Sequence, residues 1–249
     1  MEELNDLVSV IIPTYNRFSS LLKAIESVRK QSYKNKEIII INDASTQKEY
    51  YNYDFGEDII LINLPVNMRI KYGCKAAQGM TRNEGINIAN GKWISFLDDD
   101  DYWFPTKLEI QINNLNKYKK KICSTNYLVG KEPFNKNNIK KYERKLLINE
   151  EFLEKIEDNI YNIKVKKFNY MLNSTIIVDK KLLNRVGNYS LIDGEDWDLW
   201  NKIFDLENFI FINDDLIYYD DSHAGQSHYI YDDQKMQKMF SNDWNSSNK

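Results

Sequence analysis

Hydrophobic positions in the first half of the chain alternate between short β-branched runs and helix-spaced patterns. The runs are typical of buried strands and lie at residues 7–12, 37–41, 59–62 and 92–97. Apolar residues at helical spacing predict helices over 18–30, from about 75 to 89, and after Pro105. This alternation predicts an α/β fold with a doubly wound, mixed but mostly parallel sheet flanked by helices, in a single domain.

The second half of the chain is less regular. Residues 128–170 are rich in Lys, Asn and Glu, and we expect an insertion that covers the sheet, with a helical patch near residues 146–156. A further helix is expected over 196–204. Short strands are expected at residues 175–178, 209–212 and 216–219.

Three polar motifs directly follow predicted strands. They are Pro13-Thr14-Tyr15-Asn16, Asn42-Asp43-Ala44-Ser45 and the four aspartates Asp98 to Asp101. Ligands of open α/β sheets bind beyond the carboxyl ends of the strands, so we expect these motifs to surround one crevice. The sequence contains neither the G-x-G-x-x-G dinucleotide turn after the first strand nor a Walker phosphate loop.

The four consecutive aspartates repel one another, and in a shielded pocket this repulsion disfavours their ionisation. A divalent cation would offset the repulsion, and hard oxygen ligands suit Mg²⁺ or Mn²⁺ together with substrate phosphates. The alternative is an acidic surface loop, since charge runs are usually solvated. The aspartates alone leave both interpretations open, and the motifs around them favour the cation.

Composition and charge narrow the class of protein. The 249 residues carry a net charge of −3, which argues against a nucleic-acid-binding protein. Two cysteines, an acidic N-terminus and the lack of a long apolar stretch predict a cytoplasmic protein. Basic clusters at 119–121 and 136–145 are better explained as solvated helix faces. The alternative is a patch for anionic lipid head groups or a phosphorylated acceptor, which would allow peripheral association with the inner face of the membrane.

Several ordered motifs resemble the family 2 glycosyltransferases, which have the GT-A fold. Residues 8–45 contain VSVIIPTYNR and EIIIINDAST, and residues 79–111 contain RNEGI, GKWISFLDDDD and PTKL in the family's order. Residues 194–200, GEDWDLW, are similar to a third segment of these enzymes. The resemblance is strong over 7–125 and weaker over 172–225.

The resemblance implies a division of the chain. A GT-A domain would span residues 1–228, followed by a polar tail at 229–249. Within the domain, residues 7–125 would form the nucleotide-sugar-binding half. Residues 126–228, including the insertion 128–170, would form the acceptor-binding half.

By the same resemblance, the donor is a UDP-sugar held with Mn²⁺ or Mg²⁺. Asp100 would ligate the metal, Asp98 would contact the ribose or the metal through water, and Asp99 would fill the variable position of the motif. Asp43 would accept the N3–H of uracil, and Arg82 would lie near the diphosphate. The turn expected to line the nucleotide consists of Pro13, Thr14, Tyr15 and Asn16. Without the resemblance, Asp43 would be an ordinary turn residue and Arg82 a surface residue of a helix.

The acceptor side is implied by the later motif. Asp196 would remove the proton of the acceptor hydroxyl in an inverting displacement, with Glu195 and Trp197 orienting or binding the acceptor. Alternatively, the two acids simply begin a helix, where negative charge is favourable. His223 is a candidate for the metal or diphosphate site, although the segment around it departs from the family pattern and a solvated loop histidine is equally expected.

The combined expectation is a metal-dependent, inverting enzyme that adds one sugar during assembly of a bacterial surface polysaccharide or glycoprotein glycan. Its acceptor would be a glycan, a lipid-linked sugar or a glycoprotein. The Gln-x-x-Arg-Trp motif of processive synthases is missing. The alternatives are an inactive nucleotide-sugar-binding or scaffolding module and an aspartate-nucleophile phosphatase, whose motif would follow the first strand rather than the fourth.

Overall fold

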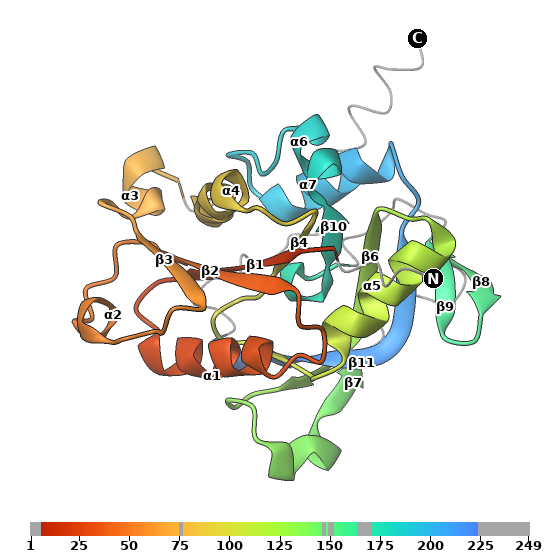
Figure 1. Cartoon of the computed structure of the whole chain (residues 1–249), viewed down its shortest axis with the longest axis horizontal. Coiled ribbons are helices and arrows are strands. Elements are labelled where there is room, and N and C mark those ends of the chain that lie inside the picture. Colours follow the sequence, from red (N-terminus) through yellow and green to blue (C-terminus); the bar gives the residue numbers. More distant parts are fainter. Residues whose placement is uncertain (1–5, 75–76, 146–147, 149–151, 164–170, 224–249) are drawn as a thin grey trace.

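The computed structural model describes residues 6–74, 77–145, 148, 152–163 and 171–223. In this part of the chain, one mixed sheet forms the centre of the molecule (Figure 1). The order of its main path is β3-β2-β1-β4-β10-β6-β11-β9-β8, with β5 pairing β11 and β7 pairing β6. The strands are β1 Val8–Thr14, β2 Lys36–Asn42, β3 Ile59–Asn63, β4 Trp93–Phe96, β5 Tyr102–Trp103, β6 Ile122–Gly130, β7 Glu143–Lys145, β8 Leu153–Glu157, β9 Ile160–Ile163, β10 Ile177–Asp179 and β11 Ile210–Asp220.

Helices cover both faces of the sheet (Figure 1). The α-helices are α1 Phe18–Arg29, α2 Glu49–Asn52, α3 Met68–Tyr72, α4 Gln78–Ile88, α5 Lys107–Tyr118, α6 Lys180–Val186 and α7 Glu195–Phe204. Short 3₁₀ helices are η2 Lys136–Lys141, η4 Asn173–Thr175 and η5 Asp221–His223. None of the helices among these described residues is long and apolar enough to span a lipid bilayer.

Alternate residues of β1 send their side chains into two separate cores. Val10 and Ile12 pack in the cluster that contains the buried faces of α1 and α5. Ile11, between them, packs in the other cluster, with residues of α4, α6 and α7. Because successive strand residues point to opposite faces, a strand covered on both sides reads as a continuous apolar run. This is why the run at residues 7–12 was recognisable in the sequence.

The first four predicted strands and the helices between them are confirmed. β1 pairs in parallel with β2 and β4, and β2 with β3, so their carboxyl ends lie at one edge of the sheet. The expected α/β fold, with a mixed central sheet flanked by helices in one domain, is confirmed. The functional motifs follow β1, β2 and β4 and are therefore brought to this edge.

The second half of the chain differs from the sequence prediction. Residues 153–157, expected at the end of a helical patch, form strand β8, which pairs antiparallel with β9 and extends the sheet. The two short strands expected at 209–212 and 216–219 are one strand, β11, with register shifts at Asp215 where it pairs with β6. Thus the insertion adds strands to the sheet, while the tail at 229–249 lies outside the described residues.

Candidate functional site

The three polar motifs meet at the carboxyl ends of the strands. The backbone N–H of Asp43 donates to the carbonyl oxygen of Thr14 over 2.9 Å, which joins the ends of β2 and β1. The Thr14 hydroxyl donates to Asp99 Oδ2 over 2.7 Å, which joins β1 to the loop after β4. The crevice expected from the fold rule therefore has its three motifs in direct contact.

The turn after β1 is fastened to the loop after β2. Asn16 has a φ of 53°, in the left-handed region that asparagine tolerates better than most residues. Its side-chain oxygen accepts from the backbone N–H of Thr46 over 2.7 Å, and its own N–H donates to the Ser45 hydroxyl over 2.9 Å. Asn16 thus holds the turn in shape, whereas the neighbouring Tyr15 side chain is 46% exposed and free to line a ligand. Pro13, before them, pairs with Ile41 inside the sheet.

Asp43 is almost buried and connects β2 to the start of α3. Its Oδ1 accepts from the backbone N–H of Met68 over 2.8 Å, and its Oδ2 accepts from Asn67 Nδ2 over 2.9 Å. Burial raises the pKa of this carboxyl, while the Met68 N–H opposes the change. Thr81 also hydrogen-bonds this carboxyl. An ionised carboxylate has about four lone-pair sites, so these contacts leave room for one further acceptor interaction with a base N–H. Uracil recognition by Asp43 stays a prediction.

The four consecutive aspartates, hereafter the tetrad, point to different partners. Asp98 Oδ1 pairs with Arg82 Nη2 at 2.5 Å. Asp99 accepts from Thr14, and both Asp99 and Asp100 pair with Arg17. Burial raises the pKa of Asp100 to about 7, and the neighbouring Asp99 adds to the shift. The repulsion anticipated from the sequence is therefore present and is offset in part by two arginines.

Asp101 fastens the tetrad to the second half of the chain. Its Oδ2 accepts from the Ser174 hydroxyl over 2.5 Å, and its Oδ1 accepts from the backbone N–H of Asp220 over 3.1 Å. Burial, followed by repulsion from Asp100, raises the pKa of Asp101 well above its usual value. The short helix η5 starts directly after Asp220 and ends at residue 223. The side chain of His223 lies outside the described part of the chain, so its role at the metal or diphosphate site stays a prediction.

Arg82 is buried, contrary to the alternative of a surface residue. Arg82 is 4% exposed, and its guanidinium carbon lies 5.8 Å from the centre of the Tyr189 ring. Burial disfavours its charge, but Asp98 and then other negative groups, including Glu195, keep its pKa above the ordinary value. Nη2 binds Asp98, whereas the buried Nε and Nη1 have no hydrogen-bond partner among the residues that the structure describes. Unpaired buried donors are costly, so this side chain is prepared for an additional acceptor.

The acids at the start of α7 lie against the start of α4. A Cβ added to Gly79 would come within 2.9 Å of Glu195 Cγ, so the absence of a side chain there permits this close approach. Burial raises the pKa of Glu195 to about 7, and the charge of Asp196 adds to the shift while Arg82 opposes it. Asp196 Oδ1 accepts from the backbone N–H of Trp197 over 2.7 Å. Both acids stand in the first turn of α7, so a helix-starting role and a catalytic role remain compatible.

The tetrad fits a divalent cation only as a partial ligand set. Among the described residues, no three His, Cys, Asp or Glu side chains converge as a ready-made metal cluster. Mg²⁺ and Mn²⁺ sites commonly use one or two carboxylates and take their other ligands from substrate phosphates and water. Asp100, whose Oδ2 binds Arg17, and Asp98, whose Oδ1 binds Arg82, can supply such carboxylates to a cation that arrives with a diphosphate.

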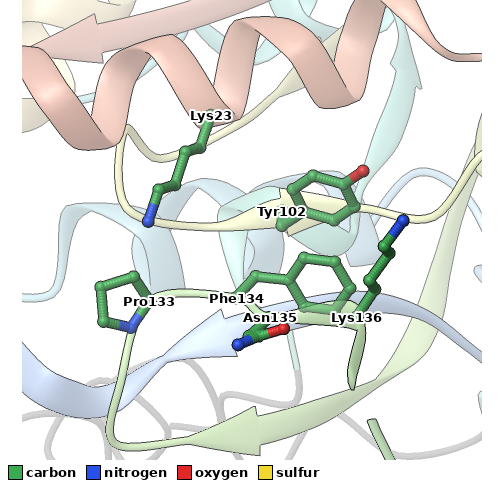
Figure 2. A pocket seen from close by; sticks show the side chains of 6 residues that line it. All are labelled: Lys23, Tyr102, Pro133, Phe134, Asn135 and Lys136. Atoms are coloured by element: carbon green, nitrogen blue, oxygen red, sulfur yellow. The ribbon is translucent and has the colours of Figure 1, made fainter. Parts of the chain in front are cut away.

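A groove of about 490 Å³ lies beside Tyr102, between Lys23 of α1 and residues 133–136 (Figure 2). Tyr102, which directly follows the tetrad, stacks on Phe134 with ring centroids 4.1 Å apart. The groove is lined by Lys23, Tyr102, Pro133, Phe134, Asn135 and Lys136. Sequence reasoning did not find it, because Phe134 comes from the irregular segment and only the folded chain brings it to Tyr102.

Comparison with protein families agrees with this geometry. The model of glycosyl transferase family 2 matches residues 9–187. The chain therefore belongs to glycosyl transferase family 2, and it is a transferase enzyme. The resemblance described from the motifs is confirmed at the level of the family.

Named relatives and solved structures extend the comparison. WfaP of Escherichia coli, a UDP-Glc:α-D-GlcNAc-diphosphoundecaprenol β-1,3-glucosyltransferase, is 33% identical over 198 residues, which are 80% of this chain and 70% of WfaP. WfgD, with the same activity in its name and also from E. coli, is 34% identical over 133 residues, half of each chain. The structure of S. aureus TarS 1-349 in complex with UDP-GlcNAc has a TM-score of 0.64 at 19% identity, covering 90% of this chain and 61% of that one. At this identity, the TarS likeness establishes the fold alone.

Proposed function

We propose that this glycosyltransferase moves a single sugar from a UDP-sugar to a hydroxyl of a lipid-linked acceptor in the assembly of a bacterial surface polysaccharide. The observation that carries the proposal is Arg82, a buried guanidinium with two unpartnered donors next to the tetrad. A diphosphate supplies the acceptors that these donors lack. The names of WfaP and WfgD specify UDP-glucose and a diphosphoundecaprenol acceptor, and TarS has been solved with UDP and with UDP-GlcNAc.

The donor half would bind the nucleotide at the three joined motifs. Tyr15 would line the base, and Asp43 would accept the N3–H of uracil. Arg82 would bind the diphosphate, on whose oxygens negative charge builds as the sugar leaves. A divalent cation, Mn²⁺ or Mg²⁺, held at Asp100 with the help of Asp98, would add Lewis-acid stabilisation of that charge.

The transfer itself would be a direct displacement that inverts the anomeric configuration. The acceptor oxygen forms a bond to the anomeric carbon while the bond from that carbon to the β-phosphate oxygen breaks. The hydroxyl proton passes to a carboxylate, for which Asp196 is the proposed base. Glu195 and Trp197 would position the acceptor, and the raised pKa of Glu195, about 7, suits a group that donates a hydrogen bond in its protonated form.

A lipid-linked acceptor requires contact with a membrane surface, and one face of the protein is suited to it. Lys23 and Lys136 lie at the groove beside Phe134, and η2 adds Lys140 and Lys141. Ile139, in the same short helix, is 41% exposed. Basic residues near an anionic membrane each contribute about 1 kcal/mol of attraction, and an exposed apolar residue adds insertion.

This membrane contact is tested with vesicles. Replacing Lys136, Lys140 and Lys141 together by Gln should weaken sedimentation with phosphatidylglycerol vesicles by roughly two orders of magnitude, from about 1 kcal/mol per lysine. Vesicles of phosphatidylcholine alone should bind the original protein weakly. Equal binding of the triple variant to anionic vesicles would remove this face from the proposal.

The donor proposal is tested by calorimetry with UDP in the presence and absence of Mn²⁺. Asp100→Ala should lose the Mn²⁺-dependent part of UDP affinity, whereas Asp158→Ala, at a carboxylate that is 96% exposed, should retain it. A panel of UDP-, GDP- and dTDP-sugars screened by thermal shift identifies the donor, because a ligand that binds the folded state raises its apparent stability. No shift with any nucleotide sugar, with or without Mn²⁺, would contradict the proposed function.

A further inference from the structure

Arg17 is the partner of the tetrad that sequence reasoning did not single out. Its Nη1 lies 2.6 Å from Asp100 Oδ2 and 3.2 Å from Asp99 Oδ1. The Arg17 side chain is 25% exposed, and those of the two aspartates are 7% and 12% exposed. One guanidinium nitrogen therefore bridges two largely shielded carboxylates and offsets part of their negative charge, and one of these is the residue proposed to bind the metal.

The fold fixes the main chain of Arg17 and leaves its side chain as the adjustable part. The backbone N–H donates to the Tyr50 hydroxyl over 3.0 Å, and the carbonyl oxygen accepts the first helical hydrogen bond of α1, from Leu21. The preceding Asn16, with its positive φ, sets the direction in which the chain enters the helix. From this anchored position the long side chain reaches the tetrad, and rotations about its own bonds can move the guanidinium without moving the turn.

Arg17 and a divalent cation compete for one carboxylate, that of Asp100. Oδ2 of Asp100 already accepts the short contact from Nη1, and two positive groups cannot share it without strong repulsion at this distance. A cation that binds alone must therefore overcome this repulsion or displace the guanidinium from Asp100, and either is unfavourable. A nucleoside diphosphate changes this, because its oxygens are a good bidentate partner for a guanidinium.

We propose that Arg17 is an internal counter-cation of Asp99 and Asp100 that couples metal binding to nucleotide binding. In the free enzyme it holds the two carboxylates and suppresses binding of the metal by itself. When the nucleoside diphosphate binds, Arg17 turns from Asp100 to the diphosphate and releases Asp100 to the metal. The inference rests on the proposed function, since it takes the diphosphate and the divalent cation as the ligands of this site.

The test measures Mn²⁺ affinity by calorimetry, and by the electron paramagnetic resonance signal of free Mn²⁺, in the absence and presence of UDP. Arg17→Gln removes the charge and should bind Mn²⁺ alone at least tenfold more tightly than the original protein. The gain in Mn²⁺ affinity caused by UDP should be at least tenfold smaller in this variant. Arg17→Lys keeps a positive charge at the site and should stay within about threefold of the original protein for Mn²⁺ alone.

A second measurement follows Arg17 in the original protein and uses a variant only to assign its signal. In ¹⁵N spectra, the side-chain signal of Arg17, assigned by its loss in Arg17→Lys, should move little with Mg²⁺ and strongly with Mg²⁺ and UDP together. Unchanged or weaker Mn²⁺ binding in Arg17→Gln, or a signal unaffected by UDP and Mg²⁺ at saturation, would overturn the role of Arg17. Failure of the original protein to bind UDP under any condition would instead overturn the proposed function.

Discussion

The replacement of Arg82 separates the stability of the fold from the binding of the donor. Arg82→Met keeps an unbranched side chain of similar length but removes the guanidinium. In the structure that guanidinium makes one ion pair, to Asp98 at 2.5 Å, and leaves two buried donors unpartnered. The loss of function and the change in stability can be worked out separately from these contacts.

For the free protein the two effects of Arg82→Met nearly cancel. Breaking a buried ion pair costs about 3–5 kcal/mol when the remaining charge stays buried. The Asp98 side chain is 34% exposed and is partly solvated, so the lower end of that range applies. Two unpartnered donors each cost about 1–3 kcal/mol, and the substitution removes both penalties. We therefore expect the free energy of unfolding to change by no more than about 2 kcal/mol.

In donor binding, no other effect of Arg82→Met offsets the lost hydrogen bonds to the diphosphate. Two charge-assisted hydrogen bonds to a diphosphate contribute about 1.5–3 kcal/mol each, so UDP affinity should fall by two to four orders of magnitude. Arg82→Lys keeps the charge without the planar pair of donors and should recover only part of the affinity. Arg29→Met is a matched control, because that arginine makes a surface ion pair with Asp58.

The assay combines calorimetric titration with UDP and Mn²⁺ with denaturant unfolding of the same samples. UDP affinity in Arg82→Met within about threefold of the original protein would show that the two donors are not used by the diphosphate. A loss of much more than about 2 kcal/mol in stability would show that the ion pair to Asp98 matters more than the unpartnered donors do.

Three further outcomes are expected. Asp43→Ala should weaken UDP binding and reduce the preference for UDP over CDP; an unchanged preference in calorimetry would remove Asp43 from the base pocket. Asp196→Asn should keep UDP affinity but slow sugar transfer by about 10²–10⁴-fold, and a rate within tenfold would exclude it as the base. Burial lowers the pKa of Lys107 from 10.5 to about 7, so between these values the unfolded chain binds more protons and stability rises with pH. In Lys107→Met the free energy of unfolding should lose this rise of about 1 kcal/mol per pH unit. The same pH dependence of the unfolding free energy in the variant and the original protein would contradict the prediction.

The first half of the fold could be predicted because its strands are buried on both faces. Continuous β-branched runs such as residues 37–41 have few other interpretations once they alternate with helices. Parallel pairing then brings their ends to one edge, so the proximity of the motifs that contain Thr14, Asp43 and Asp99 follows from topology. No detailed knowledge of side-chain packing was needed for this part of the site.

The second half could not be predicted because its pattern depends on tertiary pairing. Apolar residues between 146 and 156 suggested a helix, yet residues 153–157 pair with β9 at the edge of the sheet. The polar residues Asn213 to Asp215 separated two predicted short strands, but they lie where the single strand β11 shifts register against β6. There Arg144 binds Asp215 and the Asn213 carbonyl, so the polar side chains are held inside a continuous strand.

The sequence also did not predict the ion pairs of Arg17 with Asp99 and Asp100 or the burial of Arg82. Arg17 reaches the tetrad because Asn16 adopts a positive φ, a conformation that the sequence permits but does not require. Arg82 is buried because one face of α4 packs against β1, where Gly85 contacts the side chain of Ile11. Both residues belong to motifs that were recognised, but only the packing showed that their charges belong to the tetrad.

The charge balance of the tetrad gives an independent reason to expect metal dependence. Four carboxylates, Asp98 to Asp101, face two guanidiniums, Arg17 and Arg82. Two guanidiniums cannot offset four ionised carboxylates, and burial together with this surplus of negative charge raises the pKa of Asp100 and Asp101. A diphosphate brings more negative charge to the same place, and Arg82 alone cannot offset both. A divalent cation offsets two of these negative charges, so donor binding should weaken sharply when EDTA is present; equal UDP affinity with and without EDTA would mean that the arginines suffice.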